Sequence, residues 1–371
     1  MPKPLEGVLV ADFTTLLPGP LATLMLAEAG AEVVKIERPG GEDVRNFPLT
    51  KNGYSVPFAL LNRGKRGIVA DLKSDAGKVA AWDIVDRADV LVEQFRPGVM
   101  DRLGFGYDDV RARNPRIVYC SISGYGQSGP RSTEAGHDLN YIGATGLLSL
   151  APGPADRPVV PPALIADIGG GTFPAVTNIL LALLAREKSG EGTRIDVAMA
   201  DAMFTFAWYA LATLHSTGRN PEPGELRHNG GSPRYRLYPA SDGKLVACGA
   251  LEQHFWLAFT RAIELPEELV DDERDPAATF EAVRRIIEAK PAAHWKPIFA
   301  AADCCATIVA NLEEALADPH FIERGLFARR VSAPDGSEIP ALPVPIAPEL
   351  RVKEKVRPFP ALAAPLNGGK S

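Results

Sequence analysis

The chain has 371 residues, of which 46% are hydrophobic, and a formal net charge of −6 at pH 7. This length suits two domains with a substantial core, and the composition argues against disorder. The negative charge balance argues against a nucleic acid or a membrane surface as partner, although a small anionic ligand needs only a local basic site.

No targeting or membrane-spanning segment is expected. The N-terminal segment MPKPLEGVLVADF lacks the apolar stretch of a signal peptide, and the nearest candidate for a membrane span, AVTNILLALLAREKSG, has too short an apolar core. The four cysteines, Cys120, Cys248, Cys304 and Cys305, form no C-x-x-C pair, and two adjacent cysteines are poor disulfide partners. We therefore expect reduced thiols and a cytoplasmic protein.

Strand and helix signals alternate over the first third of the chain. Short apolar, β-branched segments predict strands at 7–13, 31–38, 66–72, 89–95 and 116–123. Helix-length segments separate several of them, at 19–30 and 75–88. Apolar strands that alternate with helices predict an α/β fold built on a parallel sheet.

Longer helical patterns follow at 172–188 and 198–218, with the short strand TRIDVA between them. A segment rich in Gly and Pro over 216–234 marks a boundary, and 235–251 is typical of a hairpin that turns at Ser241-Asp242-Gly243. The proline-rich end is expected to lie extended along a surface. These patterns predict a large α/β domain over 1–215, completed by a tail over 330–371, and a linker with a smaller α+β domain over 216–329.

Basic residues gather in three segments of the first half, KIERP (35–39), NRGKR (62–66) and FRPG (95–98). The first and third stand at strand ends, where open parallel sheets bind ligands. Arg38 and Arg96, together with Lys65 and Arg66, suit a polyphosphorylated nucleotide such as coenzyme A, because arginine binds phosphate bidentately. The alternative is that these are solvated strand ends. The turn TTLLPGPLA has no G-x-G-x-x-G pattern, which argues against a dinucleotide site.

A candidate acid–base pair lies in AGHDLNY and ADIGGGT. His137 and Asp138 could each simply cap the following helix. Asp167 precedes three glycines, which let the backbone approach a ligand closely. A helix starting near Thr172 would direct its first amides toward a developing oxyanion. Glu252, which follows the hairpin, is either a carboxylate that orients a histidine or an exposed side chain.

Several longer stretches resemble the family III CoA-transferase superfamily over nearly the whole chain. They include PGPLATLMLAEAGAEVVKIERPGG, NRGKRGIVADLKSDAG, ADVLVEQFRPGVMDRLGFGYDDVRARNPRIVYCSISGYGQSGP and SGEGTRIDVAMADAM. Within the superfamily, AGHDLNY followed by ADIGGGT resembles the α-methylacyl-CoA racemase branch. The resemblance implies an interlocked homodimer and an acyl-CoA substrate. The sequence has no cluster with metal-ligand spacing, and proton transfer requires no redox group, so we expect no metal and no cofactor beyond the CoA moiety.

The resemblance also implies roles for individual residues. His137 and Asp167 would be the acid–base pair, and Glu252 would orient the histidine. The residues implied to contact CoA are Arg38, Gly64, Lys65, Arg66, Gly67, Asp89, Arg96, Gly136, Asp138 and Tyr141. One departure concerns the acyl side of the site: racemases typically have an aspartate between two tyrosines before the hairpin, where this chain has Arg236.

The function implied is racemisation of 2-methyl-branched acyl-CoA thioesters by 1,1-proton transfer through an enolate. Removing the α-proton needs a base on one face and a proton donor on the other. Backbone amides near 169–171 would stabilise the enolate oxygen. The alternative is transfer of CoA between carboxylic acids through an aspartyl-CoA intermediate on Asp167, which gives His137 no obvious task. A CoA-binding protein without catalysis is a third reading.

Overall fold

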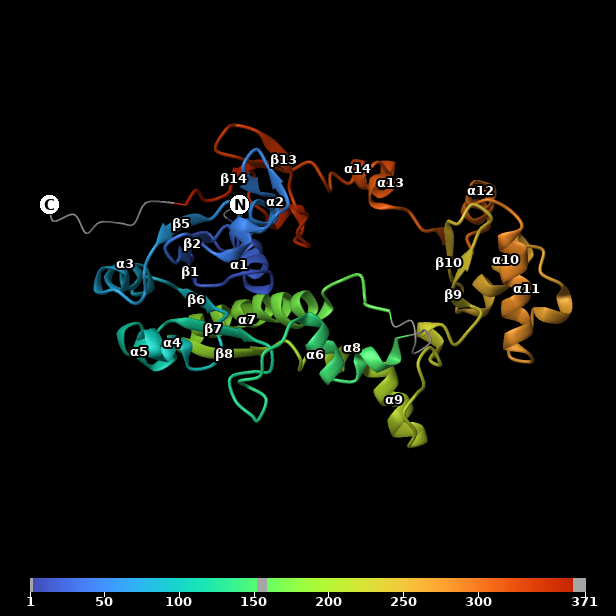
Figure 1. Ribbon diagram of the computed structural model, residues 1–371, viewed down its shortest axis with the longest axis horizontal. Helices are drawn as coiled ribbons and strands as arrows, with labels where there is room; N and C mark the ends of the chain where they lie inside the picture. The colour runs from blue at the N-terminus through green and yellow to red at the C-terminus, as the bar shows by residue number, and fades with distance from the viewer. Residues whose placement is uncertain (1–2, 152–158, 363–371) are drawn as a thin grey trace. The chain divides into compact units, whose positions relative to one another are not determined.

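The computed structural model describes residues 3–151 and 159–362, and the chain forms two compact units (Figure 1). The first unit comprises 1–145, 162–205 and 319–371, and the second comprises 146–161 and 206–318. The chain thus leaves the first unit twice and returns to it twice. The sequence predicts that the smaller domain begins near residue 215 and ends near residue 330. In the structure the long segment of the second unit begins after Thr205 and ends before Pro319.

The first unit is built on a six-stranded sheet in the order β5-β2-β1-β6-β7-β8, and every pair in it is parallel. The strands are β1 Leu9–Asp12, β2 Glu32–Glu37, β5 Arg66–Val69, β6 Val90–Glu93, β7 Val118–Ser123 and β8 Thr193–Ala198. The predicted α/β class and parallel sheet are confirmed. The strand order reverses between β1 and β6, so the loops after these two strands diverge and leave a crevice at their carboxyl ends.

Helices cover the sheet on both faces. On one face, apolar residues of α3 (Asp75–Val85), α4 (Val99–Leu103) and α5 (Tyr107–Arg113) pack against strand residues such as Leu91 and Tyr119. A separate cluster joins α1 (Pro18–Glu28), α2 (Val56–Asn62) and the start of α7 (Phe173–Ser189). α1 is buried along its whole length, which explains why its sequence is apolar on all sides.

The helix predicted from residue 172 begins earlier. A π-helical turn, η3 (Ala166–Thr172), runs directly into α7, and the joined segment Ala166–Ser189 is long and apolar enough to cross a membrane. The expectation that no segment reaches that length is wrong for this reason. Only 39% of the most apolar 18-residue stretch of this segment is buried, although α7 packs on β7, β8 and α1. A core helix has the same length and composition, so this segment is weak evidence for a membrane.

The described part of the proline-rich end forms more regular structure than its composition predicts. Strands β12 (Arg330–Ser332), β13 (Glu338–Pro340) and β14 (Val356–Pro358) make a small sheet in the order β13-β12-β14. Val331, Ile339 and Phe359 pack in one cluster with Phe58 of α2. The C-terminal segment thereby completes the first unit, while residues 363–371 lie outside the described part of the chain.

The second unit has its own core. Strands β9 (Tyr235–Pro239) and β10 (Leu245–Gly249) form the predicted hairpin (Figure 1). Strand β11 (Ala306–Ile308) pairs antiparallel with β10 as a third strand. Trp256, Phe259 and Trp295 from the helices of this unit pack with Tyr238 of the sheet. Its longer helices are α9 Trp208–Thr217, α10 Gln253–Ala262, α11 Pro276–Glu288 and α12 Ala292–Ala302.

The remaining elements are short. They are β3 Thr50–Lys51, β4 Tyr54–Ser55, α6 Asp138–Ala144, α8 Met203–Phe206, α13 Leu312–Leu316, α14 Pro319–Glu323 and the 3₁₀ turns η1 Asp43–Asn46, η2 Leu147–Leu150, η4 Arg227–Asn229, η5 Glu267–Leu269 and η6 Pro348–Leu350. All four cysteines are free.

Candidate active site

A pocket of about 460 Å³ lies in the first unit, where β1, β6, β7 and β8 end. This is the crevice expected at the point where the strand order reverses. It is lined by Leu16, Pro18, Gln94, Phe95, Arg96, Pro97, Ile122, Ser123, Gly124, Ser132, Glu134, Ala135, Gly136, His137, Asn140, Tyr141, Asp167 and Met199. The structure thus brings together five residues singled out from the sequence: Arg96, Gly136, His137, Tyr141 and Asp167.

His137 is both a helix cap and a pocket residue. It is the N-cap of α6, with extended backbone, and its main-chain N–H donates to Oδ1 of Asn140 at 3.0 Å. The main chain of His137 thus takes part in the cap, and its exposed side chain lines the pocket.

Asp167 lies in the first turn of η3, and its placement depends on Asp138. The buried carboxylate of Asp138 accepts a hydrogen bond from the main-chain N–H of Asp167 at 2.9 Å. This bond ties the start of η3, which carries Asp167, to the start of α6, which follows His137. Asp138 is itself outside the pocket lining, and its observed role is to position Asp167.

The environment of Asp167 raises the pKa of its half-buried carboxyl to about 6. Burial is the larger cause and the neighbouring Asp138 carboxylate the second, while His137 acts in the opposite direction. A carboxyl group with this pKa exchanges its proton readily near neutral pH. It can therefore serve as acid or as base in the same pocket.

We expect the free energy of unfolding of Asp167→Asn to exceed that of the parent protein at pH 7.5. The raised pKa means that ionised Asp167 is less favourable in the folded chain than in the unfolded one, whose ordinary value is 3.8. As pH falls through about 6, the folded parent takes up the proton first and gains stability, so the advantage of the variant shrinks. Urea unfolding of both proteins at pH 7.5 and pH 5 measures this change. A pH-independent difference would contradict the raised pKa.

Two of the three glycines after Asp167 have a packing role. A Cβ on Gly170 would collide with the main-chain oxygen of Met199, and one on Gly171 would lie 2.9 Å from Cβ of Pro18. Both residues are buried inside η3, which packs against α1 and β8. The expectation of a helix starting near Thr172, with its first amides free for an oxyanion, is therefore wrong, because the helical segment already starts at Ala166.

Tyr141 forms one wall of the pocket. Its hydroxyl donates to the main-chain oxygen of Gly136 at 2.5 Å, and a Cβ on Gly136 would lie 2.7 Å from its ring. Burial, more than the nearby Asp167, raises the pKa of Tyr141 to about 12, so the phenol keeps its proton. The ring fixes the loop that carries His137, which explains a glycine at 136 in packing terms.

The loop after β6 carries Arg96, whose exposed side chain lines the pocket. Gln94 on the same loop accepts a hydrogen bond from the N–H of Gly19 at 2.9 Å, and the buried Glu93 carboxylate accepts one from the N–H of Phe95 at 2.8 Å. These bonds order the loop around the arginine. Arg38 directly follows β2 at the same edge of the sheet, where it pairs with Asp43 on the surface.

The other residues implied for CoA lie elsewhere. Lys65 is fully buried and its Nζ contacts Asp12 at 3.1 Å, Thr23 at 2.8 Å and Asn62 at 2.8 Å. It is therefore not available to a phosphate. Arg66 opens β5 and pairs with Glu32 at the start of β2, which is the opposite edge of the sheet from Arg38.

Gly64, Gly67 and Asp89 also have structural surroundings. The guanidinium of Arg357 packs on Gly64, and Pro360 packs on Gly67, so the C-terminal segment covers both. Asp89 precedes β6 and pairs with Arg186 of α7 at 2.9 Å. The structure does not bring these residues to the pocket, because they stand where strands begin and not where strands end.

Glu252 and Arg236 belong to the second unit. Glu252 is exposed and is the N-cap residue of α10, and Arg236 lies on β9. The role of Glu252 beside His137 remains a prediction. In the described ranges 3–151 and 159–362, no three His, Cys, Asp or Glu side chains are placed to hold a metal ion.

Some pocket residues have no obvious signal in the sequence. Leu16, Ser123, Asn140 and Met199 line the pocket as ordinary residues of loops and strand ends. Gln94 had a usable signal, because it directly follows a predicted strand and precedes Arg96. Leu16 adopts a left-handed backbone with φ of 63°, which only the structure reveals.

The family model of CoA-transferase family III matches residues 5–364, and the chain belongs to this family of enzymes. It is 34% identical over 329 residues to a human α-methylacyl-CoA racemase, covering 87% of this chain and 82% of the relative. It is also 34% identical to an acetyl-CoA:oxalate CoA-transferase of Acetobacter aceti, covering 93% and 89%. A crystal structure of Rv3272 from Mycobacterium tuberculosis, 28% identical, superposes with a TM-score of 0.81 over 97% of each chain.

Proposed function

We propose that this enzyme racemises 2-methyl-branched acyl-CoA thioesters by 1,1-proton transfer. The observation that carries the proposal is the pairing of His137 and Asp167 in one pocket, with the pKa of Asp167 raised to about 6. Similarity to α-methylacyl-CoA racemases from human and mouse, at 34% and 35% identity, supports the same reaction.

The proposed reaction needs two proton carriers and no redox change. The imidazole of His137 removes the α-proton from one face of the thioester, and the electron pair of the C–H bond moves into the enolate. The protonated carboxyl of Asp167 then returns a proton to the opposite face. In the reverse direction, the Asp167 carboxylate is the base and protonated His137 is the acid. Glu252 would orient the imidazole.

The CoA moiety would be held by its phosphates. Arg38 and Arg96 stand at the carboxyl edge of the sheet, with exposed guanidinium groups suited to bidentate phosphate contacts. Because the thioester itself activates the α-proton, we propose that no cofactor beyond this CoA moiety is needed.

A second copy of the chain is the proposed partner, in the cytoplasm. α7 exposes a row of apolar side chains, with Leu181 58% and Leu184 67% exposed. A single chain leaves these side chains in water, and burial against a second copy would favour a homodimer.

Transfer of CoA between carboxylic acids is the second candidate, because relatives such as the Acetobacter aceti enzyme are named CoA-transferases. In that reaction the Asp167 carboxylate attacks the thioester carbonyl and expels CoA thiolate, which leaves a mixed anhydride. The thiolate then attacks the aspartyl carbonyl and releases the donor acid, giving an aspartyl-CoA thioester for the acceptor.

One incubation separates the two candidates. The enzyme is mixed with a pure enantiomer of a 2-methylacyl-CoA in deuterated water, with and without a free acceptor acid. Racemisation with deuterium at the α-carbon, independent of the acceptor, supports the proposed function. Acceptor-dependent appearance of a new thioester without α-exchange would replace it with CoA transfer.

Arg96→Ala is expected to weaken CoA binding by about tenfold or more, the effect of losing a charge-assisted contact. Added salt should weaken binding of CoA to the parent protein in the same direction, because exposed charges are screened. Calorimetric titration with CoA measures both effects. Arg66→Ala is the matched control, since this exposed arginine lies at the opposite edge of the sheet and should leave the affinity unchanged. Equal affinity in parent and Arg96→Ala would contradict the phosphate assignment.

A further inference from the structure

Both candidate reactions place negative charge on the thioester oxygen. Removal of the α-proton gives an enolate, and attack by a carboxylate gives a tetrahedral oxyanion, so that oxygen needs a hydrogen-bond donor. Two main-chain amides at the start of η3 are already used. The N–H of Asp167 donates to Asp138, and the N–H of Ile168 donates to the main-chain oxygen of Leu164 at 3.1 Å. The donor is therefore expected among the other residues of the pocket in the first unit.

Asn140 presents a free amide group to this pocket. Its Oδ1 accepts a hydrogen bond from the main-chain N–H of His137 at 3.0 Å. Because an N–H group needs an oxygen as its acceptor, this bond determines which end of the carboxamide is the oxygen and which is the nitrogen. Nδ2 donates to no described group of the chain, and the exposed side chain of Asn140 lines the pocket. Its N–H groups are therefore available to a ligand.

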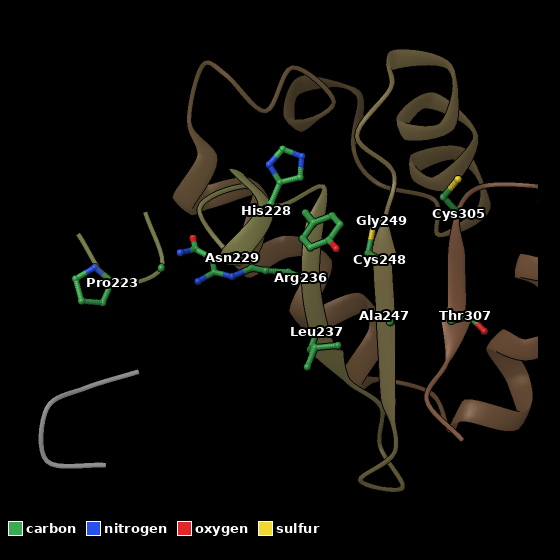
Figure 2. A pocket seen from close by; sticks show the side chains of 13 residues that line it. Pro223, His228, Asn229, Arg236, Leu237, Ala247, Cys248, Gly249, Cys305 and Thr307 are labelled. Atoms are coloured by element: carbon green, nitrogen blue, oxygen red, sulfur yellow. The ribbon is translucent and has the colours of Figure 1, made fainter. Parts of the chain in front are cut away.

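Several other asparagines use their Nδ2 group within the chain. Nδ2 of Asn114 donates to the main-chain oxygen of Ala88 at 2.7 Å. Asn229, labelled in Figure 2, lines a separate pocket of about 730 Å³, whose lining in the described part of the chain belongs to the second unit. Its Nδ2 donates to the main-chain oxygen of Leu150 at 2.8 Å. Asn140 differs from both, because its oxygen is bound and its nitrogen is left open to the pocket.

Three hydroxyl groups of the same pocket are less suited to an oxyanion. The hydroxyl of Tyr141 already donates to a main-chain oxygen. Oγ of Ser123 has no partner among the described residues, but it is enclosed by protein atoms. No described contact orients the hydroxyl of Ser132, which also lines the pocket. A donor that is open to the pocket and already oriented is what an oxyanion requires.

Gln94 is the strongest rival of Asn140. Its Oε1 accepts a hydrogen bond from the main-chain N–H of Gly19 at 2.9 Å, so its amide nitrogen is also directed away from that bond. Gln94 lies on the loop that carries Arg96, and we expect its amide to meet the CoA moiety. Asn140, in contrast, is bound to the main chain of His137, which is one of the two proton carriers.

We propose that Asn140 is a catalytic hydrogen-bond donor, whose Nδ2 group binds the thioester oxygen and stabilises the negative charge that develops there. The identity of the substrate in this proposal rests on the proposed function. The bond to the main chain of His137 holds the carboxamide in place before the substrate arrives, so little reorganisation is needed during the reaction. A neutral amide suits this task, because it donates a hydrogen bond to the oxyanion without protonating it.

Asn140→Asp removes the donor and keeps an oxygen for the main-chain N–H of His137. Losing one oxyanion donor usually lowers kcat by about 10²- to 10³-fold, and we expect this loss in α-deuterium exchange from a pure 2-methylacyl-CoA enantiomer. KM should change by less than about threefold, because the bond strengthens mainly as charge develops. Asn311→Asp is the matched control. Asn311 is an exposed cap of α13 outside the pocket, and its Oδ1 accepts from the N–H of Glu314 at 2.8 Å.

Two further variants separate the lost donor from the added charge. Asn140→Leu removes the donor without adding charge, so it should show a similar loss of kcat. Asn140→Gln keeps a carboxamide at a helix position where glutamine also forms the cap, and it should be at least about tenfold faster than Asn140→Leu. Thermal unfolding identifies the variants that are folded. A folded Asn140→Leu with a kcat within about threefold of the parent value would overturn the proposal.

A binding measurement gives a readout without turnover. An S-alkyl-CoA thioether has a methylene group in place of the thioester carbonyl, so it lacks the oxygen that Asn140 is proposed to bind. Calorimetry should show equal affinity of this thioether for the parent and for Asn140→Leu, within about twofold, because the CoA contacts are intact. A loss of more than about tenfold would mean that the variant disturbs the CoA site, and the catalytic role would be overturned.

The outcomes for this inference and for the proposed function can be told apart. If the parent racemises the thioester and both Asn140→Asp and Asn140→Leu keep its rate, the inference fails and the proposed function stands. If the parent transfers CoA without α-exchange, the proposed function fails. A loss of about 10²-fold in that transfer by Asn140→Leu would still support Asn140 as the donor to the thioester oxygen.

Discussion

Replacing His137 by alanine is expected to lower the rate of racemisation of 2-methylacyl-CoA by about 10²- to 10⁴-fold, which is the usual loss when one proton carrier is removed. Each proton carrier should face one side of the α-carbon, so each single variant should still remove the α-proton from the enantiomer that presents it to the remaining carrier. His137→Ala keeps slow exchange with solvent deuterium from the enantiomer whose proton faces Asp167. Asp167→Ala shows the opposite preference.

The measurement is deuterium incorporation at the α-carbon from each pure enantiomer in each variant. Glu252→Gln should be milder than either change, because Glu252 orients the imidazole and carries no proton. CoA transfer predicts a different pattern, in which Asp167→Ala abolishes all activity and His137→Ala keeps much of it. Equal residual exchange from both enantiomers in His137→Ala would mean that one residue serves both faces, and the opposed-pair mechanism would be wrong.

Lys65→Met is expected to lower the free energy of unfolding by about 3–5 kcal/mol, the loss typical when one partner of a buried ion pair is removed. Burial alone would raise the pKa of Asp12, but attraction to Lys65 and Lys35 lowers it to about 2. Burial lowers the pKa of Lys65 to about 8, so both groups are charged at pH 7. The variant leaves a buried carboxylate short of one partner. Urea unfolding at pH 7 measures the loss.

Two comparisons show whether this loss is structural. Arg66→Met changes the exposed neighbour of Lys65 and should alter the free energy of unfolding by no more than about 0.5 kcal/mol. Asp12→Asn combined with Lys65→Met should recover part of the loss, because no unpaired charge then remains buried. Folded Lys65→Met should bind CoA as the parent does. A large loss of CoA affinity with unchanged stability would restore Lys65 to the phosphate site.

The sequence by itself determined the parallel sheet and the placement of the residues that follow its strands. β-branched segments alternate with helical ones, and this local pattern decides that each strand is reached by a crossover and runs parallel to its neighbours. Arg96 follows β6, so its position at the carboxyl edge follows directly. His137 and Asp167 were found through a composite motif, and the structure places both at one pocket.

Only the tertiary structure decided what the basic and glycine-rich segments do. The predicted strands already separate Lys65, which precedes one, from Arg96, which follows one, and the structure places the two residues at opposite ends of the strands. Whether Lys65 binds a phosphate or pairs with the buried Asp12 depends on residues that are dozens of positions away in the sequence. Likewise, Gly170 is small because Met199 packs against it, a contact between distant segments that no local pattern encodes.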